Sequence, residues 1–186
     1  MNPYVKLAKE AVENYIEKEK IISPAENLPK HLLSRKSGVF ITIEKNGELR
    51  GCIGTYIPTR ITIAEEIIRN AVAAATEDYR FDSIKKEEFS ELSYTVYVLS
   101  YPEPIEDIKE LNPKKFGVIV KTVPFTFPNQ DVIFNDNVPS KSGLLLPGLP
   151  DIDNVEKQFL IACEKGEIDP VKEKVYIYRF TVEKYE

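Results

Sequence analysis

Residues 38–55 carry the feature that most constrains how this chain can fold. Residues 39–43 are rich in β-branched and aromatic side chains, Asn46-Gly47 follows them, and a second apolar segment reaches Thr55. Asn-Gly is the preferred pair for a two-residue type I′ turn, which joins antiparallel strands. We therefore expect a β-hairpin here, and with it an antiparallel sheet at the centre of the fold.

The turn also predicts which side chains share a face of the hairpin. Because side chains alternate along a strand, Arg50 and Cys52 are expected on one face with Ile41 and Ile43. A β-bulge near the glycines would shift this register. The expected pairs are Lys45 with Glu48, Ile43 with Arg50, Ile41 with Cys52 and Val39 with Gly54, which leaves Phe40, Thr42, Leu49 and Ile53 on the opposite face.

Helical patterns surround the hairpin. Asn2 and Pro3 open a helix expected to reach Lys20, and Thr62 with Glu65 forms a capping box before an alanine-rich helix. We further expect helices over residues 86–92 and from Asp153 to about residue 165, strands over 94–100, 116–121 and 175–184, and a long loop over 122–142 with room for a strand at 132–134.

This order of elements favours an α+β fold over a parallel one, because hairpins outnumber βαβ units. The sheet is expected to be mainly antiparallel, with flanking helices. We expect one domain over residues 1–186, with two lobes around a cleft and a weak division near residue 105.

Charge and composition narrow the classes of function. The formal net charge of -5 argues against a surface built to wrap nucleic-acid phosphates. No apolar run approaches the roughly 18 residues of a membrane span, and the N-terminus carries Glu10 and Glu13 where a signal peptide would be apolar. Two cysteines and one histidine are too few for a disulfide framework or a His-rich metal site. We expect a cytoplasmic protein without a metal or other cofactor.

The hexapeptide at residues 49–54 reads LRGCIG. It resembles the hallmark motif of the AMMECR family, named after the Alport syndrome, midface hypoplasia and elliptocytosis chromosomal region. Five further segments resemble the family in the family's own order, so the resemblance covers most of the chain. They lie at residues 38–43, 70–81, 98–105, 142–147 and 178–180. The chain departs from the family at Phe116, where members often carry histidine, so no role of a family histidine transfers to it.

The resemblance implies an α+β fold of two lobes, with the hexapeptide near the cleft between them. It also implies an enzyme-like protein for which no settled reaction is known. Some members are fused to, or encoded near, Memo-type and radical-SAM proteins, which suggests a link to such partners. An unknown small molecule or protein partner is all that the resemblance allows us to expect, and it leaves the oligomeric state open.

Cys52 is the first candidate catalytic residue. A thiolate can act as a nucleophile when a nearby cation favours it, and Arg50 lies two residues away. Gly51 and Gly54 would let a substrate approach the backbone closely, so both are candidate binding residues. The alternative for Cys52 is a small buried side chain in a hairpin, where free cysteine usually lies. No histidine base is expected, since His31 lies in a proline-flanked loop.

Asp78 is the second candidate catalytic residue, as an acid–base group, and Arg80 could bind an anionic substrate beside it. The alternative, which we favour, is that Asp78 caps a turn and Arg80 pairs with it. Arg50 could hold a carboxylate or phosphate through its forked donors, or form a structural ion pair with an acidic residue such as Asp78. Ser142 is a further candidate binding residue, although turn geometry explains it without a substrate.

Two hypotheses of function follow. The first is a small-molecule enzyme whose cleft contains Cys52 and Arg50. The second is a protein-binding or adaptor module in which LRGCIG is a structural motif and the long loop presents an apolar surface with Phe125, Phe127 and Phe134. The acidic net charge counts against a third hypothesis, direct RNA binding.

Overall fold

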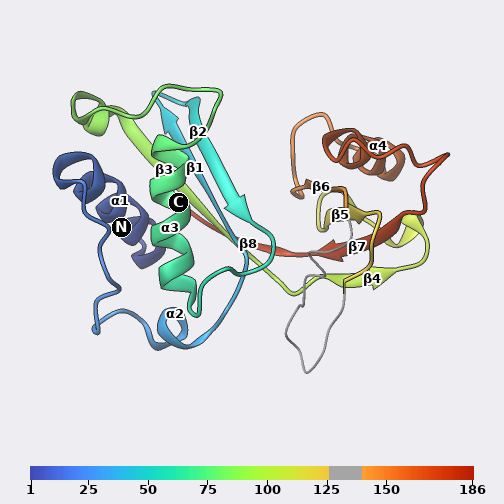
Figure 1. Ribbon diagram of the computed structural model, residues 1–186, viewed down its shortest axis with the longest axis horizontal. Helices are drawn as coiled ribbons and strands as arrows, with labels where there is room; N and C mark the ends of the chain where they lie inside the picture. Colours follow the sequence, from blue (N-terminus) through green and yellow to red (C-terminus); the bar gives the residue numbers. More distant parts are fainter. Residues whose placement is uncertain (126–139) are drawn as a thin grey trace. The chain divides into compact units, whose positions relative to one another are not determined.

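The computed structural model describes residues 1–125 and 140–186, and the described chain forms two compact units. Unit 1 comprises Met1–Leu99 with Glu183–Glu186, and unit 2 comprises Ser100–Val182. Each unit contains one four-stranded sheet with helices beside it (Figure 1). The α+β class with antiparallel strand pairing, expected from the sequence, is confirmed. The lobe division near residue 105 stays a prediction.

The sheet of unit 1 is ordered β2 (Glu48–Thr55), β1 (Val39–Lys45), β3 (Leu92–Leu99) and β8 (Val182–Tyr185). The hairpin β1–β2 is therefore central to it, with β2 at one edge. Four helical segments belong to the same unit: α1 (Pro3–Lys18), α2 (Lys30–Ser34), α3 (Ile63–Thr76) and the 3₁₀ helix η1 (Lys86–Glu91).

The helices of unit 1 begin where the sequence places their caps. The Asn2 side chain accepts a hydrogen bond from the Tyr4 N–H at 3.0 Å, and the Thr62 hydroxyl accepts one from the Glu65 N–H at 3.2 Å. Helix α3 packs on both strands of the hairpin and on α1, and most of its residues are buried. The small alanine side chains of α3 allow this close approach: a Cβ built on Gly51 would lie 2.1 Å from the carbonyl oxygen of Ala74.

The register expected for the hairpin is wrong beyond the turn. Lys45 does pair with Glu48, but a bulge follows, so that Ile43 lies opposite Gly51 and Thr42 opposite Cys52. Arg50 is the extra residue of the bulge. The cause is the contact of Gly51 with α3, which requires the residue without a side chain to face the helix. Cys52 therefore lies on the face opposite to the buried isoleucines of β1.

Unit 2 has the strand order β4 (Glu103–Ile105), β7 (Tyr176–Phe180), β5 (Gly117–Lys121) and β6 (Ser142–Leu145). Helix α4 (Val155–Lys165) packs on β6 and β5, and the short 3₁₀ helix η2 (Ile108–Glu110) contacts α4. A Cβ on Gly143 would collide with the carbonyl oxygen of Ala162, so the helix lies almost on the backbone of β6.

Several expected elements need correction. The stretch expected to close the chain as one strand divides at Thr181 into β7 and β8, which belong to different sheets. The cap of α4 is Asn154, whose side chain accepts from the Lys157 N–H at 2.8 Å, and not Asp153. Helix α2 and strand β4 were not anticipated, because both are too short to show a period. The strand considered at 132–134, with Phe127 and Phe134, lies outside the described residues.

Candidate functional site

Cys52 lies on the sheet face that no helix of unit 1 covers. Because Gly51 faces α3 and side chains alternate, the thiol of Cys52 points to the other side. It is half-buried there, and its Sγ lies 3.4 Å from the hydroxyl oxygen of Thr42, the residue directly opposite on β1. The thiol therefore has a polar neighbour and partial access to solvent.

Aromatic side chains share this face with the thiol. Phe40 lies over Gly54, where a Cβ would come within 2.2 Å of the phenyl Cγ. Tyr97 of β3 lies opposite Phe40, and burial raises the pKa of its phenol, with the nearby Cys52 adding to the rise. We call Phe40, Thr42, Cys52, Gly54 and Tyr97 the Cys52 face. It combines a thiol, two hydroxyls and two aromatic rings.

Asp78 supports the Cys52 face from behind the strand edge. Its carboxylate accepts a hydrogen bond from the backbone N–H of Cys52 at 2.8 Å, which satisfies an outward donor of the edge strand β2. The same carboxylate accepts from Arg80 Nε at 2.9 Å and Nη2 at 2.7 Å. These bonds to Arg80, followed by the backbone bonds, lower the pKa of Asp78 to about 2.

The geometry matches the structural interpretation of this pair. Asp78 is buried and ionised at neutral pH, with its oxygens already occupied, so it is not poised to exchange a proton. Arg80 is the more exposed partner. The Asp78 carboxylate raises the pKa of the Arg80 guanidinium first of all, and the neighbouring Cys52 adds to that effect. A cation thus stands within electrostatic range of the thiol.

Arg50 pairs with Glu88 and not with Asp78. Its Nε and Nη2 each donate to a carboxylate oxygen of Glu88 at 3.0 Å, and its Nη1 donates to the Asp82 carbonyl at 2.8 Å. This bidentate contact is the main cause that lowers the pKa of Glu88 to about 2. All three guanidinium nitrogens are engaged, so Arg50 fastens β2 to the segment before β3.

Sequence reasoning missed two carboxylates. Glu88 could have been found only weakly, as the N3 residue that accepts from the Lys85 N–H at the start of η1. Glu66 left a clearer signal, since it lies on the apolar stripe of α3. It is fully buried and accepts from the Thr55 hydroxyl at 2.6 Å and from the Thr59 and Arg60 N–H groups at 2.7 and 2.8 Å. It fixes the segment that follows β2.

The remaining candidates lie elsewhere. Ser142 begins β6 in unit 2, opposite Lys121. His31 stacks on Tyr4, with 5.8 Å between ring centroids. Phe125 is buried and its ring packs on Tyr178, so it is not part of an exposed apolar surface. Cys163 is buried in unit 2, where burial raises the pKa of its thiol to about 11.

Two searches of the described residues are negative. Residues 1–125 and 140–186 contain no cluster of three or more His, Cys, Asp or Glu side chains arranged to bind a metal. In the same ranges, no helix has both the length and the apolar character that crossing a bilayer requires.

Comparison with known proteins settles the family. The AMMECR1 family model matches residues 5–185. The chain belongs to the AMMECR1 family. This AMMECR1 chain is 44% identical to a protein of Thermotoga maritima over 99% of its own length and 97% of the relative's. It is 39% identical to a Clostridium acetobutylicum protein, of which it spans 35%.

The AMMECR1 fold also matches a solved structure. The crystal structure of an uncharacterized protein from Pyrococcus horikoshii superimposes with a TM-score of 0.80 at 31% identity, covering 97% of this chain and 88% of the other. A Thermococcus gammatolerans protein is 35% identical over 98% of this chain and 87% of its own length. The resemblance seen in the sequence is thus confirmed, and none of these names carries an activity.

Proposed function

We propose that this AMMECR1 protein is a small-molecule enzyme in which Cys52 is the nucleophile. The observation that carries the proposal is the position of the thiol: it is half-exposed on a helix-free sheet face, 3.4 Å from the Thr42 hydroxyl and within electrostatic range of Arg80. Reactive cysteines lie in partly exposed, electropositive surroundings of this kind, whereas structural cysteines are buried and inert. Cys163 is an example of the second kind within the same chain.

The proposed chemistry is transfer of an acyl or alkyl group to sulfur. The Cys52 thiolate would attack an electrophilic carbon, so that an S–C bond forms while the leaving group departs with the electron pair of the bond that breaks. The thiol proton would pass to solvent, since the single histidine of the chain stacks on Tyr4. Arg80 is assigned to stabilise the thiolate, and Asp78 and Arg50 are positioning residues that hold β2.

The test is the rate at which iodoacetamide labels each cysteine of the folded protein, read by mass spectrometry. We expect Cys52 to be labelled rapidly at pH 7, while Cys163 serves as the internal control and resists. Replacing Arg80 with methionine should slow labelling at pH 7 and leave the rate at pH 9.5 unchanged, because only the thiolate fraction changes. Labelling of Cys52 only after unfolding would overturn the proposal.

A binding module is the second candidate, and one observation favours it. Tyr79, between Asp78 and Arg80, is 96% exposed. An uncovered aromatic ring beside the hexapeptide is typical of a contact surface. In this case Tyr79→Ala should abolish self-association in sedimentation velocity while Cys52→Ala retains it. If both variants sediment as the parent protein does, self-association through this surface is excluded.

A further inference from the structure

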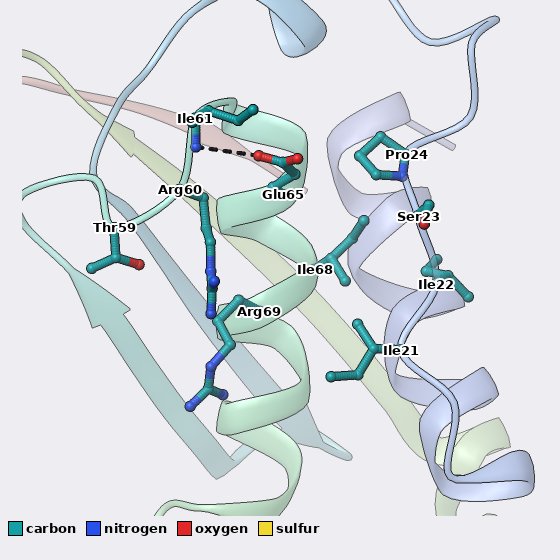
Figure 2. Close-up of a pocket in the computed structure, with 10 residues that line it drawn as sticks. All are labelled: Ile21, Ile22, Ser23, Pro24, Thr59, Arg60, Ile61, Glu65, Ile68 and Arg69. Carbon is teal, nitrogen blue, oxygen red and sulfur yellow. Dashed lines mark hydrogen bonds between the residues drawn. The ribbon is translucent and has the colours of Figure 1, made fainter.

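A second concave site lies on the helical side of unit 1. It is a groove of about 460 Å³ between residues 21–24, which follow α1, and residues 59–61, which precede α3. Figure 2 shows these two segments on either side of α3, which contributes Glu65, Ile68 and Arg69. Cys52 points to the opposite face of the sheet, so the groove is separate from the proposed catalytic face. Its volume lies in the range of small-molecule sites, roughly 300–1,000 Å³.

The groove is lined largely by apolar side chains. Ile68 is buried and points from α3 toward the segment that follows α1 (Figure 2). Ile21 and Ile61 stand at the rim with 57% and 69% of their surface exposed. Exposed isoleucines on both sides of one concave surface are costly to leave in water, and a bound apolar group would cover them.

The rim near Ile61 is fixed before any ligand arrives. Buried Glu66 accepts the N–H groups of Thr59 and Arg60, and Glu65 accepts the N–H of Ile61 at 3.2 Å (dashed in Figure 2). Three consecutive backbone donors are therefore bonded to α3. A rim held in this way loses little conformational entropy on binding, which favours affinity.

One cation in the groove lacks a counter-charge. Arg69 is held by Glu77 through two hydrogen bonds of 3.0 and 2.9 Å, so its charge is balanced. The Arg60 guanidinium has no ion pair or hydrogen bond to any residue that the structure describes. Figure 2 shows its side chain extended along the groove beside α3. The groove thus offers an apolar surface with one uncommitted, forked donor group, which suits a carboxylate.

We propose that this groove binds a small amphipathic carboxylate, an aliphatic chain or ring with a single anionic head. The apolar part lies against Ile21, Ile61 and Ile68, and the carboxylate accepts hydrogen bonds from Arg60. A cationic or neutral amphiphile satisfies only the apolar half of the site. The proposal does not depend on the chemistry of Cys52.

Decanoate is the probe, and its binding is measured by calorimetry and by chemical shifts of labelled full-length protein. We expect saturable binding with shifts centred on residues 21–24 and 59–61. Decanol and decylammonium should bind at least fivefold more weakly. Arg60→Gln should weaken decanoate binding about fivefold, as expected for one partly exposed ion pair. The matched control Arg35→Gln removes an exposed arginine outside the groove and should leave affinity unchanged.

The apolar half of the site has its own test. From hexanoate to octanoate to decanoate, affinity should rise about threefold to fourfold per methylene, the value expected for full burial. Affinity independent of chain length, or equal loss in Arg60→Gln and Arg35→Gln, would overturn the proposal. So would decanol binding as tightly as decanoate. If an acidic peptide shifts the same resonances and decanoate does not, the groove is a peptide site and the small-molecule assignment is wrong.

Discussion

Gly51 shows how one residue in the hexapeptide constrains its neighbours. A side chain there would meet the backbone oxygen of Ala74 at 2.1 Å, and a backbone atom inside a helix cannot move aside cheaply. We expect Gly51→Ala to destabilise the protein by about 3 kcal/mol in urea unfolding. The control is Gly47→Ala: Gly47 has open space and a φ of +84°, so about 1 kcal/mol is expected from strain alone. Equal effects would contradict the packing argument.

The same contact explains what could and could not be read from the sequence at this scale. Local patterns predicted the turn at Asn46-Gly47 and the pairing of Asp78 with Arg80, because both depend on residues close in the chain. The partner of Arg50 was assigned wrongly. Glu88 lies 38 residues further along, and only the tertiary arrangement brings the two side chains together.

At the scale of elements, Glu88 joins β2 to the start of β3. Its pKa in the folded protein is about 2, below the value of about 4.3 in an unfolded chain. A depressed pKa adds stability that is fully present above pH 4.3 and is lost as the pH falls toward 2. Because Glu88 is largely shielded from solvent, we expect this loss to reach about 2 kcal/mol.

Urea unfolding at pH 7, 5, 3 and 2 tests this assignment. Glu88→Gln should be less stable than the parent at pH 7 and should lose about 2 kcal/mol less between pH 5 and pH 2. Glu26→Gln, at an exposed position, should follow the parent curve. Parallel curves for the parent and Glu88→Gln would show that Arg50 gains nothing from the ionised carboxylate.

The elements themselves were predictable where a period or a cap is strong. The helices that became α1 and α3 carry side-chain caps, and their bounds agree with expectation within a few residues. The hairpin bulge was not predictable, because it answers to the contact between Gly51 and α3. The break at Thr181 was also hidden, since the alternation of apolar residues continues across it while the strand changes sheets.

At the scale of the whole molecule, the last residues of the chain complete the first unit. Unit 2 is inserted between β3 and β8, so the sheet of unit 1 receives its edge strand from the C-terminus. Tyr185 of β8 stacks on Tyr4 of α1, with ring centroids 3.8 Å apart and planes 9° apart. The two ends of the chain are thereby joined within one core.

This arrangement predicts where a C-terminal substitution acts. Tyr185→Ala should cost about 2–3 kcal/mol, because it removes the stacked ring and its burial. Tyr79→Ala, at a fully exposed ring, should stay within about 0.5 kcal/mol of the parent. In hydrogen exchange, the amides of α1 and β3 should lose protection while those of β5 keep it, since the Tyr185 ring packs within the core of unit 1. Equal loss in β5 would mean that both units open together, and the insertion would then be a feature of topology without separate stability.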